Sequence, residues 1–220
     1  MTITLIFMAA VMAIVIWWLF RQSVNVQPWD AHGSIDDVHA GALSRPPIKT
    51  ALWVFLAVAT SLFALFISAY AMRMKLGDWN RLHEPLLIWF NTGLLIVTSL
   101  AMQRAVVAAK RGDRDGVRTA LIGAGVLTFA FLAAQLIVWQ QLSNAGFYLS
   151  TNPAYGFFYL LTAVHGVHVL GGLVAWSRTA ARVFRGVGVA RVRLSVELCA
   201  IYWHFLLVVW LVLFALLLST

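Results

Sequence analysis

Six long apolar stretches dominate this chain of 220 residues. A helix needs about 20 mostly apolar residues to cross the hydrocarbon core of a bilayer. Runs of that kind lie at roughly 2–20, 51–72, 85–108, 117–141, 155–177 and 194–219. Charged residues make up only 11% of the chain, whereas a soluble domain carries about 25%. We therefore predict an all-α fold: a polytopic membrane helix bundle with six transmembrane helices.

Basic residues predict which side of the membrane each loop faces, because loops rich in Lys and Arg stay in the cytoplasm. The loops after the first, third and fifth spans hold thirteen of them, and the opposite loops hold only Arg73, Lys75 and Arg81. The thirteen are Arg21, Arg45, Lys49, Arg104, Lys110, Arg111, Arg114, Arg118, Arg178, Arg182, Arg185, Arg191 and Arg193. Both termini are therefore predicted to be periplasmic, in a bacterial cytoplasmic membrane. The net charge of +8 indicates orientation and contact with anionic lipid headgroups, and no nucleic-acid partner is expected.

The first apolar run has no basic segment before it and no small-x-small cleavage pattern after it. Both features are typical of a cleaved signal peptide, so we expect a retained anchor. We predict that residues 1–47 form an N-terminal anchor helix with a cytoplasmic loop. The remaining five spans, in residues 48–220, form the main bundle. Pro153 precedes the fifth span, where a proline can begin a helix without losing a needed N–H.

Two histidines interrupt the fifth apolar run, in the segment LLTAVHGVHVLGG (160–172). His165 and His168 are three residues apart and share a helix face. His165 and His204 each lie about ten residues into their spans, which is roughly 15 Å deep. Consecutive antiparallel helices pack side by side, so these histidines can lie at one level. Glu197 comes seven residues before His204 and shares its face.

Three roles are open for these histidines. They can form interhelical hydrogen bonds, with Gly166, Gly171 and Gly172 letting the backbones approach closely. They can serve a partner subunit in a polar or protonic role. They can ligate haem or metal, but two histidines three apart on one helix cannot hold both axial positions of one iron.

We favour the first role, with His165 or His168 neutral, hydrogen-bonded and free of metal between the fifth and sixth spans. Trp203 and Trp210 are seven apart on the sixth span. Either core packing or a partner-facing stripe would explain them, and core packing is favoured.

Two segments of the chain resemble one known family. STNPAYGFFYLLTAVHGVHVLGGL (150–173) and VELCAIYWHFLLVVWLVLF (196–214) are similar to subunit III of haem–copper cytochrome c oxidases. Residues 52–70 and 86–105 support the resemblance, and the latter contains Asn91 in an asparagine–threonine pattern like that of the family. The resemblance covers about residues 48–219, a subunit III-like five-helix core, and leaves the first span outside it.

The resemblance implies a non-catalytic subunit of an oxidoreductase complex. Members of the family bind no haem or copper themselves. They pack on the haem-bearing subunit I, in a complex that also contains subunit II, and they hold phospholipids. They support stability and proton uptake while the complex reduces oxygen to water in aerobic respiration.

No catalytic or metal-binding residue is therefore expected in this chain. The residues expected to make interhelical, lipid or partner contacts are Asn91, His165, His168, Glu197, Tyr202, Trp203, His204 and Trp210. The family often has a serine–glutamate pair in the second span and an aspartate after YWHF. Here these positions are Val58, Ala59 and Leu207, so no proton-handling role tied to those acids carries over.

Other functions fit the sequence less well. An accessory subunit of nitric oxide reductase is the nearest alternative, since related small members of this superfamily accompany that enzyme. A stand-alone b-type cytochrome would need a partner histidine for each iron; His204 could supply one, and no second histidine lies at that depth, so a dihaem site is poorly supported. A transporter is expected to show broken helices or an internal repeat, and neither is visible in the sequence.

Overall fold

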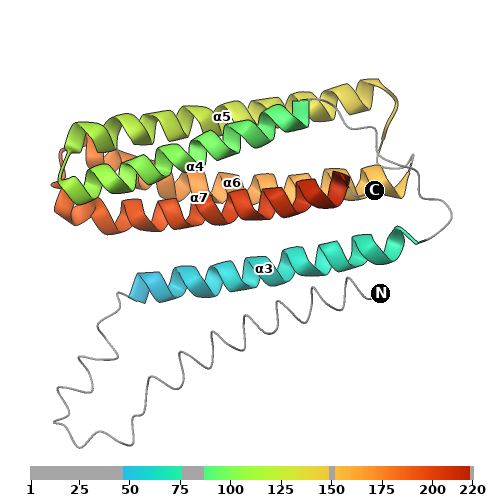
Figure 1. The fold of residues 1–220 in the computed structure, drawn as a ribbon, viewed down its shortest axis with the longest axis horizontal. Helices are drawn as coiled ribbons and strands as arrows, with labels where there is room; N and C mark the ends of the chain where they lie inside the picture. Colours follow the sequence, from blue (N-terminus) through green and yellow to red (C-terminus); the bar gives the residue numbers. More distant parts are fainter. Residues whose placement is uncertain (1–46, 76–86, 149–151, 219–220) are drawn as a thin grey trace, which may run out of the picture. The chain divides into compact units, whose positions relative to one another are not determined.

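The computed structural model describes residues 47–75, 87–148 and 152–218. All regular structure within these ranges is helical, and the order of the helices can be followed in Figure 1. The helices are α3 (Pro47–Arg73), α4 (Leu87–Arg111), α5 (Arg114–Asn144), α6 (Pro153–Phe184) and α7 (Val189–Leu218). All five are long and apolar enough to cross a membrane. The prediction of an all-α membrane protein is confirmed with five spans, and the sixth span predicted at 2–20 lies outside the described residues.

The helices continue beyond the apolar runs at their basic ends. Helix α6 has 32 residues, which makes it about 48 Å long, against a hydrocarbon core of about 30 Å. Most basic residues assigned to loops in the sequence, among them Arg104, Arg178 and Arg193, therefore lie on helical turns. The apolar runs predicted the membrane-spanning part of each helix. They did not predict where the helix itself ends.

Helices α5 and α6 each begin at a capping side chain. Between α4 and α5 only two residues are non-helical, because Asp113 caps α5 at once: its carboxylate accepts from the Gly116 backbone N–H over 3.0 Å. The preceding Gly112 has a φ of 74°, a conformation that favours glycine. Helix α6 begins as predicted, with Pro153 in its first turn and the Asn152 side chain accepting from the Ala154 N–H over 3.1 Å.

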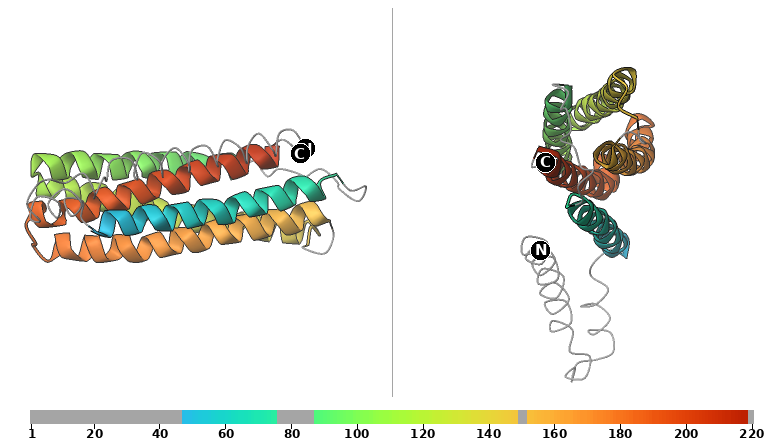
Figure 2. Two further views of the ribbon diagram at one scale, coloured as in Figure 1. Left: turned by 90° about the horizontal axis from the view of Figure 1, so that it is seen from below. Right: turned by 90° about the vertical axis from the view of Figure 1, so that its right-hand side faces the viewer.

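The chain divides into two compact units, Met1–Ala71 and Met72–Thr220. The second unit contains α4, α5, α6 and α7. Within it, α4 packs against α5 and α7, and α6 packs against the same two helices. Figure 2 shows these four helices around a common centre when the unit is viewed end-on. The predicted domain boundary at residue 47 stays a prediction, because residues 1–46 are outside the described ranges.

Glycine allows close approach at two points of this unit. A Cβ added to Gly125 of α5 would lie 2.6 Å from Cη2 of Trp176, and one added to Gly172 of α6 would lie 2.6 Å from Cε1 of Tyr202. The expectation for Gly172 is therefore confirmed. The expectation for Gly166 and Gly171 is wrong, because nothing lies within 4 Å of a Cβ at either position. Those two glycines point away from the neighbouring helices.

Large apolar side chains cover the outside of the four-helix unit. Examples with more than half of their surface exposed are Trp89 and Phe90 on α4, Val126 and Phe129 on α5, Val167 and Val174 on α6, and Val208 on α7. An apolar surface of this extent is unfavourable in water and ordinary in lipid. The unit is therefore built to be surrounded by a bilayer or by other membrane subunits.

Candidate functional site

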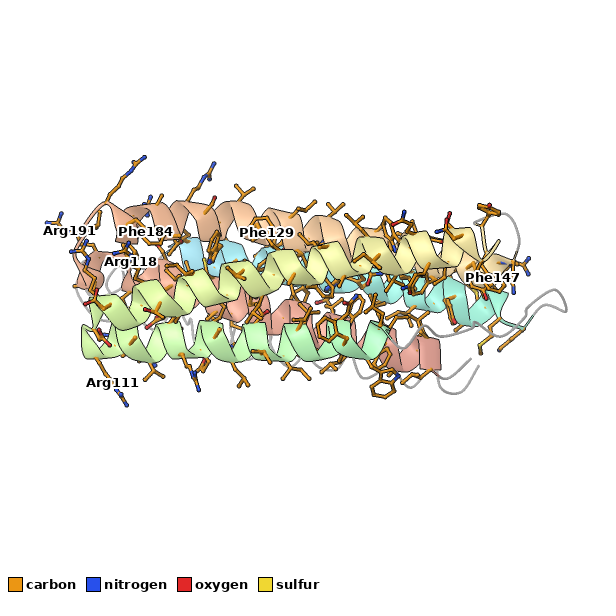
Figure 3. All side chains as sticks on the ribbon, turned by 90° about the horizontal axis from the view of Figure 1, so that it is seen from above. Arg111, Arg118, Phe129, Phe147, Phe184 and Arg191 are labelled. Carbon is orange, nitrogen blue, oxygen red and sulfur yellow. The ribbon has the colours of Figure 1, made fainter. Side chains whose placement is uncertain are left out.

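Basic side chains gather at one end of the four-helix unit. Figure 3 shows Arg111, Arg118 and Arg191 at that end, with Phe147 at the other. The basic ends of the helix pairs are in contact, since Arg114 Nη2 donates to the Val183 carbonyl over 3.4 Å. The Arg118 guanidinium also lies over the Phe184 ring, 5.0 Å from its centroid. Two of the three predicted basic segments therefore share one side.

Glu197 belongs to this basic end. Its carboxylate accepts from Arg193 Nε over 3.1 Å, one turn away on the same helix. The structure thus gives Glu197 a local ion pair with a side chain that is itself half-exposed. An exposed pair of this kind contributes little to stability.

His204 lies against α4, not against the histidines of α6. Its Nδ1 is hydrogen-bonded to the Ser99 hydroxyl, and its Nε2 lies 3.2 Å from Gln103 Oε1. Because the Gln103 oxygen can only accept, Nε2 carries the ring proton and Nδ1 accepts from Ser99. The sequence predicted a depth for His204 but not the helix that it faces. Both ring nitrogens are engaged in holding α7 to α4.

His165 is fully buried in the centre of the unit. Its ring centroid lies 5.1 Å from that of Trp210 on α7 and 6.0 Å from that of Phe131 on α5. The sequence predicted a hydrogen bond for one of the α6 histidines within this interface. Neither ring nitrogen of His165 has a hydrogen-bond partner among the residues that the structure describes. His165 therefore makes no direct hydrogen bond to those residues, and its ring packs between aromatic rings.

His168 links α6 to α7 through its backbone. The Tyr202 hydroxyl donates to the His168 carbonyl over 2.8 Å. The His168 ring stays with its own helix, where Nδ1 lies 2.8 Å from the Val164 carbonyl oxygen. The acceptor of this interhelical bond is the backbone carbonyl of residue 168. The bond therefore does not depend on which side chain stands at that position.

Tryptophan indoles form most of the remaining bonds between helices. Trp203 and Trp210 are both buried, as core packing requires. Four indole N–H groups donate across helices over 3.0–3.2 Å: Trp203 to Thr128 Oγ1, Trp210 to Thr92 Oγ1, Trp139 to Thr162 Oγ1 and Trp176 to the Leu121 carbonyl. Two of these bonds join α5 to α6, one joins α4 to α7 and one joins α5 to α7. Trp176, which its position near a span end would assign to the membrane interface, is thus a helix-packing residue.

The threonine acceptors share one local feature that the sequence analysis missed. The hydroxyls of Thr92, Thr128 and Thr162 each donate to the backbone carbonyl four residues earlier, over 2.7–3.0 Å. The hydroxyl proton is thereby used within the helix, and the oxygen lone pairs remain to accept an indole N–H. A threonine in the middle of an apolar run, opposite a tryptophan, is the signal that could have found these pairs.

Asn91 and Gln135 form the central bond between α4 and α5. Asn91 Nδ2 donates to Gln135 Oε1 over 2.9 Å, and both side chains are buried. The sequence singled out Asn91 through its asparagine–threonine pattern and did not single out Gln135. It could not pair them, because pairing depends on how the two helices are rotated against each other.

Metal-ligating side chains do not cluster in the parts of the chain that are described. No group of three or more His, Cys, Asp or Glu residues there is placed to hold a metal ion. Several of the described polar side chains join helices instead, and others bond to the backbone of their own helix. The fold and these contacts together define the class: a polytopic membrane helix bundle with polar contacts between its helices.

Comparison with known proteins identifies the family. The family model described as cytochrome c oxidase subunit III matches residues 2–219. The probable cytochrome c oxidase subunit 3 of Nocardia farcinica is 30% identical over 197 residues, which cover 83% of this chain and 93% of that protein. That of Mycobacterium tuberculosis is 29% identical over 184 residues, covering 79% and 88%. The heme-copper oxidase subunit I+III of Aeropyrum pernix is 25% identical over 210 residues, covering 90% of this chain and 25% of its own length.

The chain belongs to the cytochrome c oxidase subunit III family, whose members are subunits of haem–copper oxidases. The resemblance read from the sequence is thereby confirmed. Its extent was underestimated: the family match begins at residue 2 rather than near residue 48. The first apolar run therefore belongs to the family match and is not an addition to it.

Proposed function

We propose that this chain packs on the haem-bearing subunit I of a haem–copper oxidase and supports oxygen reduction without a catalytic site of its own. The main support is the family match, which spans residues 2–219. A second support is the Aeropyrum relative, whose name joins subunits I and III in one protein. Subunit II is expected in the same complex on the strength of the family alone.

The haem and copper of the complex belong, in this proposal, to partner subunits. His204 supports this, because a histidine ligand needs an unshared ring nitrogen and both nitrogens of His204 are engaged by α4. The indoles and threonines of the unit are likewise bonded to each other. The chain thus contributes packing and not redox chemistry.

Phospholipids and partner subunits are proposed to cover the apolar outside of the unit, where residues such as Phe90, Phe129 and Val167 are more than half exposed. Support for proton uptake would then be indirect, through the stability of the partner. The positions where the family often carries acids are Ala59 and Leu207 in this chain, and neither of these side chains can transfer a proton.

The orientation follows from the basic end of the unit. Arg114 and Arg118 meet the end of α6 there, and the positive-inside rule assigns such an end to the cytoplasm. Two spans before α4, the one expected at 2–20 and α3, would bring the chain from the periplasm back to the periplasmic side where α4 begins. We place the basic end in the cytoplasm of a bacterium and the C-terminus in the periplasm, with the N-terminus on the same side as the C-terminus.

Affinity purification tests the proposal. A tagged full-length chain is extracted from its native membranes in mild detergent, and the copurifying proteins are identified by mass spectrometry. Recovery of a haem-bearing oxidase subunit I is the expected result. Recovery of a nitric oxide reductase subunit instead would favour that alternative, and recovery of the chain alone would contradict the proposal.

A further inference from the structure

Four buried polar atoms of the four-helix unit have no hydrogen-bond partner among the described residues. They are Asn91 Oδ1, Gln135 Nε2 and the two ring nitrogens of His165. The side chains that carry them are 0%, 5% and 0% exposed, respectively. Buried polar atoms in native proteins nearly always have a partner, because an unpaired one loses its hydration without compensation. We therefore expect a bound molecule to form hydrogen bonds with these four atoms.

The two amides hold their unpaired atoms side by side. Asn91 Nδ2 donates to Gln135 Oε1 over 2.9 Å. Each amide has its nitrogen and oxygen on one carbon, so the unpaired Asn91 Oδ1 and Gln135 Nε2 flank the same hydrogen bond. The pair joins α4 to α5 and presents one acceptor and one donor.

His165 lies at the same height in the unit, as the contacts of α5 with α6 show. Its ring contacts Phe131, one turn before Gln135 on α5. Trp139, one turn after Gln135, donates to Thr162, one turn before His165 on α6. Gln135 is thus bracketed along α5 by two residues that touch the turn of α6 ending at His165.

The same height follows from α7 and α4. The His165 ring lies 5.1 Å from the Trp210 ring. The Trp210 indole donates to the hydroxyl of Thr92, the residue next to Asn91, over 3.0 Å. His165 and both amides therefore belong to one polar layer, which we define as Asn91, Gln135 and His165.

The chemistry of the unpaired atoms selects the ligand. Asn91 Oδ1 can only accept, Gln135 Nε2 can only donate, and a neutral imidazole offers one donor and one acceptor. A cation would be opposed by the amide N–H, and an anion by the amide oxygen. A small neutral molecule that both donates and accepts suits all three side chains. Water is that molecule, and buried waters typically bond to about three polar groups.

We propose that one or more water molecules bind in the polar layer and bridge His165 to the Asn91–Gln135 pair. The water bridge connects α6 to α4 and α5 at the height of His165, whose ring makes no direct hydrogen bond to another described residue. It also gives His165 a role, as the group that anchors water in the centre of the unit. This role is independent of which oxidase subunit packs on the outside.

The direct test is a cryo-electron microscopy structure of the intact complex purified through this chain, at a resolution that shows ordered water. The expected result is solvent density within about 2.7–3.2 Å of a His165 ring nitrogen and of Asn91 Oδ1 or Gln135 Nε2. Direct bonding of His165 to a protein group or to a lipid would overturn the proposal. Absence of density in the layer, at a resolution that shows waters elsewhere in the complex, would overturn it too.

A double-mutant cycle tests the bridge by energy. Asn91→Leu and His165→Leu are made singly and together, and the inactivation half-life of the complex in detergent is measured. A shared water predicts that the combined change departs from the product of the single changes by at least about twofold. The matched cycle uses Asn91→Leu with His168→Leu, because the His168 ring is bonded within its own helix. Equal departures in the two cycles, or none in the first, would contradict the bridge.

Discussion

Replacing Gly172 by Ala is predicted to loosen the contact between α6 and α7. The added Cβ would lie 2.6 Å from Tyr202 Cε1, 3.0 Å from Tyr202 Cδ1 and 3.2 Å from Trp203 Cη2. Neither ring is free to move aside. The Tyr202 hydroxyl is bonded to the His168 carbonyl over 2.8 Å, and the Trp203 indole to Thr128 over 3.2 Å. The substitution must therefore shift the helices or break a hydrogen bond.

The magnitude follows from three terms. Overpacking by one methyl group costs about 1–3 kcal/mol. Loss of one hydrogen bond between membrane helices adds about 0.6 kcal/mol. The better helix propensity of alanine returns about 1 kcal/mol. The unfolding free energy is thus expected to fall by about 0.6–2.6 kcal/mol.

The matched control is Gly171→Ala, one residue earlier. Nothing lies within 4 Å of a Cβ at Gly171, so only the propensity term applies, and the variant should be as stable as the parent or more so. Unfolding of the purified chain from mild detergent by sodium dodecyl sulfate, followed by circular dichroism, measures both variants. A Gly172→Ala variant at least as stable as Gly171→Ala would refute the close packing of α6 on Tyr202.

Three further predictions concern bonding, orientation and role. Trp203→Phe should reduce the free energy of unfolding, and Thr128→Val should then cost little more, because their bond is already lost; full additivity of the two changes in a double-mutant cycle would argue against the bond. Gly188→Cys, at an exposed turn where a Cβ meets nothing within 4 Å, should resist impermeant thiol reagents in intact cells and react in inverted vesicles. The native Cys199 is buried, and reaction of residue 188 in intact cells would reverse the proposed orientation. Deleting the chain should leave the haem spectrum of the partner intact while shortening the active lifetime of the oxidase, and loss of that spectrum would contradict a non-catalytic role.

Hydrophobicity alone predicted the five described helices, because a bilayer demands long apolar runs and the chain supplies them. It also predicted the start of α6, since Asn152 and Pro153 determine that end through local geometry. The ends at Phe184 and Val189 lay beyond the predicted runs. The basic turns at these ends are helical too, and a hydropathy pattern cannot predict helical turns made of polar residues.

For the candidate site, the sequence did not predict how each helix is rotated toward its neighbours. Gly166, Gly171 and Gly172 look alike in the sequence, yet only Gly172 meets a neighbouring helix. His204 was expected beside the histidines of α6 but is bonded to Ser99 and Gln103 of α4. Which side of a helix meets which neighbour depends on the packing of all four helices, and a run that is apolar all round carries little information about it.

The most direct test of the proposed role is the visible spectrum of the tagged chain, purified once from cells that contain oxidase subunit I and once from cells that lack it. Haem absorption is expected in the first preparation and none in the second, because the haem belongs to the partner. Haem absorption that persists without subunit I would show that this chain binds haem itself. Its absence from both preparations would show that the chain does not associate with a haem-bearing subunit.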